Sequence, residues 1–180
     1  MHKRLQPLLN KPLRTHLVSF ALFAAILVAS AFIIEHGFNA APCHLCWLQR
    51  YGHWAVLFIA LSGALLPYRG QMLALRGVFL AALYGFILGV YHSLVQGKYI
   101  AGPSGCSGIS ALPTDLESFN KYLENPTLPP RCDEVGFAAF GISLPVWNVA
   151  VMAFLMAAVY IVYKHHKLQR LKQPEQEHHD

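Results

Sequence analysis

Four apolar runs, each close to the length of a membrane-spanning helix, constrain the fold of this chain more than any other feature. They cover residues 17–34, 47–66, 72–95 and 144–163. A helix needs roughly 20 mostly apolar residues to cross a hydrocarbon core, and it satisfies its own backbone polar groups in lipid. Since 55% of the 180 residues are hydrophobic and 13% are charged, we expect an all-α membrane protein. The predicted fold is a bundle of four transmembrane helices in a single domain, residues 1–180.

The positions of lysine and arginine predict which way the bundle faces. Basic residues precede the first run and follow the fourth: Lys3, Arg4, Lys11, Arg14, Lys164, Lys167, Arg170 and Lys172. Arg69 lies in the short turn before the third run, whereas residues 35–42 contain no lysine or arginine. By the positive-inside rule, both termini and the short turn face the cytoplasm. The other two loops hold all four cysteines and therefore face an oxidising compartment, where disulfides persist.

The net charge of +5 does not indicate a nucleic-acid-binding protein. The basic residues lie where topology signals lie, and no basic patch is interleaved with aromatic residues. A cleaved signal peptide is an alternative interpretation of the first run, since Ala29-Ser30-Ala31 resembles a cleavage site. The run is longer than the roughly 7–15 apolar residues of such a peptide and continues past that site. We therefore expect a retained span and no nucleic-acid partner.

The second outer loop, residues 97–143, is too long to be an idle connection. Cys106 lies in a glycine-rich stretch, which predicts an exposed and mobile segment. Thr114-Asp115-Leu116-Glu117 has the spacing of a helix capping box, and Asn125-Pro126 ends the apolar pattern that follows. We expect a short amphipathic helix here, lying on the membrane surface or packed against the bundle.

A Cys-x-x-Cys motif, Cys43 to Cys46, follows Pro42 at the start of the second run, and Gln49 and Arg50 come next. If the chain is helical from here, Cys46 and Arg50 lie on one face, one turn apart. The guanidinium and the positive end of the helix favour a thiolate over a thiol. Arginine at this depth is costly unless a polar or anionic group needs it. Arg50 is therefore a functional candidate, although it could also reach lipid headgroups.

Several other polar residues near the outer side are candidates. Gln49 could hydrogen-bond a ligand carbonyl or face the headgroups. His92, near the outer end of the third run, is either a proton donor or quinone ligand, or an ordinary interfacial histidine. His44, between the two cysteines, and His53, one turn below Gln49, are weaker candidates. Arg76 is interpreted as a topology or headgroup residue.

The four cysteines allow several interpretations. They could form two structural disulfides. A four-cysteine zinc site does not fit well, because 25 residues separate Cys106 from Cys132. Attachment of c-type haem requires histidine directly after the second cysteine, and Trp47 stands there. The remaining interpretation is a redox relay, in which one pair exchanges with a protein partner and the other with an electron acceptor. We expect no metal.

The motif Pro-Cys-x-Leu-Cys-x-x-Gln-Arg at the start of the second of four helices resembles the DsbB family of bacterial disulfide bond formation proteins. The second cysteine pair in the following outer loop is also similar to this family. The same holds for Gly141-Ile142-Ser143-Leu144-Pro145-Val146-Trp147, which leads into the last run. The resemblance covers residues 17–163.

In that family a membrane quinone reoxidises the dithiol of a periplasmic thioredoxin-fold oxidase, DsbA. The resemblance implies that Cys106 forms the mixed disulfide with such a partner. Cys132 would pass the oxidation state on to Cys43. Cys46 would be the thiolate that faces the quinone, with Arg50 beside it. His92 would match the family's quinone-side histidine.

The resemblance therefore implies a quinone-dependent protein-disulfide oxidoreductase of the bacterial inner membrane, with ubiquinone or menaquinone as cofactor. A vitamin K epoxide reductase-like enzyme is the nearest alternative. In that family the active Cys-x-x-Cys lies in a late helix, whereas here Gln49 and Arg50 follow the first pair. A non-enzymatic membrane scaffold with two permanent disulfides is an alternative of another class. Thiol trapping in membranes separates the two classes, because only a relay has reducible, quinone-dependent pairs.

Overall fold

This computed structural model describes residues 7, 9–103, 106, 116–117 and 131–176. Four long helices make up most of the described residues: α2 (Leu13–Gly37), α3 (His44–Gly63), α4 (Tyr68–Gln96) and α6 (Leu144–Gln176). A short antiparallel hairpin, β1 (Ala138–Ala139) and β2 (Ile142–Ser143), precedes α6. The all-α architecture is thus confirmed, apart from this hairpin.

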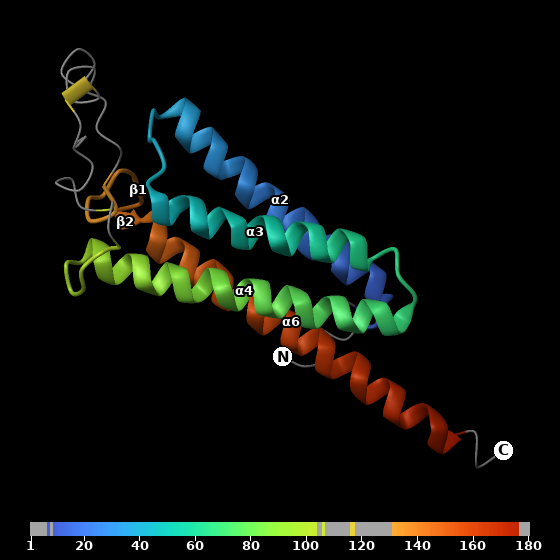
Figure 1. The fold of residues 1–180 in the computed structure, drawn as a ribbon. Coiled ribbons are helices and arrows are strands. Elements are labelled where there is room, and N and C mark those ends of the chain that lie inside the picture. The colour runs from blue at the N-terminus through green and yellow to red at the C-terminus, as the bar shows by residue number, and fades with distance from the viewer. Residues whose placement is uncertain (1–6, 8, 104–105, 107–115, 118–130, 177–180) are drawn as a thin grey trace.

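The helices are arranged so that both cysteine-bearing segments reach the same end of the bundle (Figure 1). Helix α3 packs against α2 and α4, and α4 packs against α6, whereas α2 and α6 have little contact. The α2–α3 connection and the hairpin lie at one end, and the α3–α4 turn lies at the other. The last part of α6 projects beyond that second end.

Three helical segments of the described chain are long and apolar enough to cross a membrane. They are α2, α4 and residues Leu144–Lys172 of α6, which supports a multi-pass membrane protein. Helix α3 is less apolar because its first half contains His44, Gln49, Arg50 and His53. The prediction of four spans is therefore confirmed in part, and the exception is the helix that carries the Cys-x-x-Cys motif.

Small residues bring the helix backbones close together in the middle of the bundle. A Cβ atom on Gly52 of α3 would lie 3.3 Å from Cα of Gly85 on α4, so α3 and α4 approach closely at this point. Such approach through glycine is typical of helices that associate in membranes. The close approach at Gly52 and Gly85 holds the first half of α3 against the last half of α4, where His92 lies.

The starts of α3 and α6 follow the sequence signals. Cys43 is the N-cap of α3, with φ −75° and ψ 174°, and its Sγ accepts the backbone N–H of Cys46 at 3.4 Å. Pro145 stands in the first turn of α6, where proline is well tolerated. The Trp147 indole N–H donates to the Ala139 oxygen at 3.1 Å, so this side chain fastens the hairpin to α6.

Two expectations for the second outer loop need comment. The predicted amphipathic helix lies outside the described residues, except that Leu116 and Glu117 are helical. The prediction that Cys106 is exposed is wrong, since it is 2% exposed and forms a disulfide with Cys132. The disulfide and its apolar neighbours cover the Cys106 side chain.

Candidate active site

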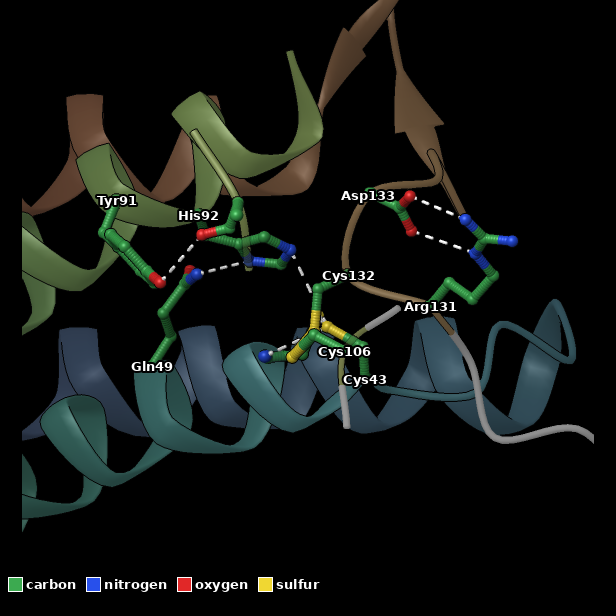
Figure 2. Close-up of a disulfide and its surroundings, with 10 residues drawn as sticks. Cys43, Gln49, Tyr91, His92, Cys106, Arg131, Cys132 and Asp133 are labelled. Atoms are coloured by element: carbon green, nitrogen blue, oxygen red, sulfur yellow. Dashed lines mark hydrogen bonds and ion pairs between the residues drawn. A yellow bond between two sulfur atoms is a disulfide. The ribbon is translucent and has the colours of Figure 1, made fainter. Parts of the chain in front are cut away.

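The structure brings all four cysteines together at one end of the bundle, and Figure 2 shows Cys43, Cys106 and Cys132 side by side. Cys106 and Cys132 form a disulfide, whereas Cys43 and Cys46 are free, with their sulfur atoms 3.1 Å apart. Both pairs belong to one buried cluster, which also contains Leu45 and Val95. An oxidised pair thus packs beside a reduced pair that lies far away in the sequence.

Several contacts stabilise negative charge on the sulfur of Cys43, which precedes α3. Sγ of Cys46 lies 3.1 Å from Sγ of Cys43, within hydrogen-bond distance, and His92 Nε2 lies 3.7 Å from the same Cys43 sulfur. The Cys46 hydrogen bond, followed by the His92 contact, lowers the pKa of Cys43, and burial opposes this effect only in part. The geometry therefore stabilises a thiolate at Cys43, whereas the assignment of the quinone-facing thiolate to Cys46 stays a prediction.

Gln49 and His92 contact each other instead of standing apart as two independent ligands. The Gln49 side-chain N–H donates to Nδ1 of His92 at 2.7 Å. Figure 2 shows the imidazole between Gln49 and Cys43, with one nitrogen toward each. Both side chains are buried. The proximity of α3 and α4 creates this contact, which sequence spacing alone does not predict.

Arg50 forms an ion pair that the sequence analysis missed. Its Nη1 lies 2.6 Å from Oε2 of Glu35 on α2, and Nη2 donates to the Ala31 oxygen at 3.3 Å. The guanidinium also lies over the rings of Phe32 and Trp47, 5.1 and 4.8 Å from their centroids. The signal for Glu35 was present, since it is the only acidic residue in the first 114.

A cavity of about 230 Å³ lies between α2, α3, α4 and α6 at the cysteine end. Five of the predicted site residues border it: Cys43, Cys46, Gln49, Arg50 and His92. Apolar side chains of α2 and α6, such as Leu27 and Val151, form much of the remaining wall. Cys106 and Cys132 do not border this cavity and pack with Cys43 in the same buried cluster. The arrangement combines an apolar pocket with a few converging polar groups, which is typical of small-molecule sites.

A second polar pair borders the same cavity deeper in the bundle. His53 Nε2 lies 2.9 Å from the Asn148 oxygen, and the Asn148 amide N–H donates to the Gly85 oxygen at 2.9 Å. His53 was a weak candidate in the sequence, and Asn148 was missed. Asn148 is the only amide or charged side chain in residues 144–163, and that isolation in an apolar run is the signal that could have identified it.

Cys43, Cys46 and His92 also place three metal-ligating atoms within 4.8 Å of one another. Two thiolates on a tetrahedral zinc ion, with Zn–S distances of about 2.3 Å, would lie roughly 3.8 Å apart. The two free sulfur atoms are closer than this, at 3.1 Å. The spacing therefore fits a dithiol that forms and breaks a disulfide better than a zinc site.

Comparison with known proteins gives consistent matches over most of the chain. The family model "Disulfide bond formation protein DsbB" matches residues 13–162. The Disulfide bond formation protein B of Pasteurella multocida is 34% identical over 154 residues, covering 79% of this chain and 83% of that protein. The protein of the same name from Herminiimonas arsenicoxydans is 30% identical over 156 residues, covering 83% of this chain and 93% of that protein. The protein of the same name from Marinobacter nauticus is 31% identical over 142 residues, covering 75% of this chain and 82% of that protein.

Proposed function

This chain belongs to the DsbB family of disulfide bond formation proteins, and we propose that it is a membrane thiol:quinone oxidoreductase. It takes two electrons from the dithiol of a periplasmic, DsbA-like thioredoxin-fold oxidase and passes them to a quinone of the membrane pool. Family membership supports the role in membrane disulfide bond formation. The partner, the quinone and the inner-membrane location are parts of the proposal.

One observation carries the proposal: a disulfide, Cys106–Cys132, packs against a free dithiol, Cys43 and Cys46. Disulfides exchange when a thiolate attacks a disulfide sulfur, so an oxidised pair and a reduced pair in one cluster can exchange electrons. Two permanent structural disulfides would instead leave no free thiol, whereas the structure has two free thiols, Cys43 and Cys46.

Electrons enter the relay at the second outer loop. A thiolate of the reduced partner attacks Sγ of Cys106, and Cys132 leaves with the electron pair of their bond. Cys132 then attacks Cys43 in the Cys43–Cys46 disulfide, and Cys46 leaves as a thiolate. These two steps move two electrons from the partner toward the dithiol and need no further oxidant.

The relay is reset by two more exchanges. The second partner thiolate attacks the partner sulfur bonded to Cys106, so the partner leaves with its own disulfide. The released Cys106 thiolate attacks Cys132, and Cys43 leaves. The products are a Cys106–Cys132 disulfide and a Cys43/Cys46 dithiol, which is the bonding pattern of the structure.

The cavity beside Cys46 fits the ring of a quinone. Arg50 has five N–H donors, and the contacts with Glu35 and Ala31 use Nη1 and Nη2, so donors remain for a ring oxygen. The weak contact between α2 and α6 offers an apolar route from the bilayer. When bound, the quinone accepts two electrons and two protons and becomes a quinol. A sink of this kind is needed because a DsbA-like oxidant has a potential near roughly −120 mV.

The test is quinone reduction by the purified protein, with a reduced DsbA-like partner as electron donor and short-chain ubiquinone or menaquinone as acceptor. The proposal predicts one quinone reduced for each partner dithiol oxidised. It also predicts no partner-dependent reduction by the Cys132→Ser variant. A scaffold protein would show no partner-dependent quinone reduction, and its thiol state would not respond to the quinone supply.

A further inference from the structure

Gln49, His92 and Cys43 form a buried line of contacts across the α3–α4 interface (Figure 2). Their exposed fractions are 7%, 2% and 5%, so water does not compete for these contacts. In such surroundings a hydrogen bond is electrostatically stronger than in water. The imidazole of His92 cannot serve a ligand with the nitrogen that Gln49 holds, and its other nitrogen lies toward Cys43.

The contact with Gln49 sets the protonation pattern of the imidazole. Because the amide N–H of Gln49 donates to Nδ1, Nδ1 provides a lone pair and the hydrogen of the neutral ring is on Nε2. Nε2 lies 3.7 Å from Sγ of Cys43. The N–H of His92 therefore lies opposite the sulfur, where it stabilises a thiolate.

We propose that His92 donates a hydrogen bond to the Cys43 thiolate as this sulfur leaves its mixed disulfide with Cys132, and that Gln49 is a positioning residue that keeps His92 in the donating tautomer. This inference rests on the proposed relay and refines one of its steps. It also changes the roles expected from the sequence, in which Gln49 and His92 are candidate ligands of the quinone.

The step that His92 assists is balanced within the chain. The thiolate of Cys106 attacks Sγ of Cys132, the Cys106–Cys132 bond forms, and the Cys132–Cys43 bond breaks. The electron pair of the broken bond goes to Cys43, and His92 keeps its proton. A leaving thiol with a lower pKa leaves faster, so the hydrogen bond from His92 accelerates this exchange.

The other polar groups around Cys43 do not replace His92. The Cys46 thiol and backbone N–H also contact the sulfur, but they belong to the same redox pair and the same helix turn. The remaining charged groups near the cavity form ion pairs, so their charges largely cancel. Arg50 pairs with Glu35 from α2. Arg131 pairs with Asp133 and Glu134 in the segment before β1. His92 is therefore the contact on Cys43 that another helix provides.

The test measures the thiol of Cys43 alone, in the full-length protein without quinone or partner. The background variant carries Cys46→Ser, Cys106→Ser and Cys132→Ser, and the measured quantity is the rate of iodoacetamide alkylation against pH. Loss of a hydrogen bond to a charged group should raise the apparent pKa by about one pH unit. His92→Phe should therefore slow alkylation about tenfold at a pH below both apparent pKa values. Gln49→Leu should shift the profile in the same direction by less.

Two further variants separate this effect from a loss of structure. Gln49→Glu should lower the apparent pKa of Cys43, because a carboxylate accepts the Nδ1 hydrogen and favours the imidazolium form. Misfolding of the site would not produce a shift in that direction. Asn148→Leu removes a half-buried polar contact of the same cavity and should leave the Cys43 profile unchanged.

An unchanged alkylation profile in both His92→Phe and Gln49→Leu overturns the inference. If those variants then weaken only the affinity for quinone, His92 serves the quinone, as the sequence analysis expected. Failure of the parent protein to reduce quinone would instead overturn the proposed function. The two failures are distinguishable, because the alkylation assay contains neither quinone nor partner.

Discussion

At the scale of single residues, Arg50 shows how a full charge is accommodated among apolar helices. Its guanidinium pairs with Glu35, bonds the backbone oxygen of Ala31, and stacks near Phe32 and Trp47. A buried charge whose partner is removed is strongly destabilising. Glu35 therefore allows a cation to remain one helical turn from the dithiol, at the edge of the cavity in which we propose that the quinone binds.

Replacement of Arg50 tests its place in the quinone site. Arg50→Met should slow quinone reduction by about 10²-fold, since this is the usual effect of removing one preorganised donor. The mixed disulfide between Cys106 and the partner should still form. Arg50→Lys should restore only part of the rate, because an ammonium lacks the planar fork of donors. Steady-state kinetics measures the rate of quinone reduction, and thiol trapping on the same preparations measures formation of the mixed disulfide. If Arg50→Met reduces quinone at the rate of the parent protein, the quinone binds elsewhere.

Replacement of Glu35 tests the ion pair itself. Glu35→Gln keeps the shape but leaves Arg50 without its anion, which should cost about 1–2 kcal/mol, less than for a fully buried pair because Glu35 is partly exposed. Tm in detergent should fall by roughly 2–8 °C. Glu134→Gln, in an exposed pair with Arg131, is the matched control and should not change Tm. Equal Tm values for both variants would mean that the Glu35 pair adds no stability.

At the scale of elements, the active site depends on how closely α3 approaches α4. Gln49 and His92 meet because Gly52, one turn from Gln49, and Gly85, two turns from His92, let the two backbones come together. The polar first half of α3 is tolerated since its side chains find partners on α2, α4 and α6: Glu35, His92 and Asn148. These polar side chains are also why α3 is not among the three described helices that are apolar enough to cross a membrane by composition.

A single methyl group should disturb this interface. In Gly52→Ala the added Cβ lies 3.3 Å from Cα of Gly85 and 3.4 Å from a Tyr84 ring carbon, so the helices must separate slightly. Such overpacking costs about 1–3 kcal/mol and should lower both Tm and the rate of quinone reduction. Gly37→Ala, whose Cβ meets only Ile33 at 4.0 Å, is the control. If Gly52→Ala behaves like Gly37→Ala, the close approach does not position the site.

The sequence predicted the four long helices and singled out five of the residues that border the cavity, and it failed where a contact depends on helix crossing. Apolar run length and the Pro42-Cys43 start predicted α3 and its dithiol. The contact of Gln49 with His92 depends on which faces of α3 and α4 meet, and no periodic pattern encodes that. The hairpin was missed because its turn places Phe140, with φ 54°, before Gly141, in contrast to the usual Asn-Gly signal.

At the scale of the whole molecule, the cysteine end and the opposite end differ in charge. The N-terminal segment, the α3–α4 turn and the end of α6 carry most of the lysine and arginine residues, and the positive-inside rule predicts that these parts face the cytoplasm. A reporter enzyme that is active only in the periplasm should therefore be active when fused after Gly108 and silent after Lys164. The reverse pattern would place the cysteines in the cytoplasm and contradict the relay.

The most direct test of the central claim follows both redox pairs in a single turnover. The fully oxidised protein, loaded with quinone, is mixed with one equivalent of reduced DsbA-like partner, and quinone reduction and thiol states are measured in the same sample. The relay predicts that the partner becomes oxidised, that one quinone is reduced, and that Cys106→Ser abolishes both. Quinone reduction that proceeds at the normal rate in Cys106→Ser, or partner oxidation without quinone reduction, would contradict the account.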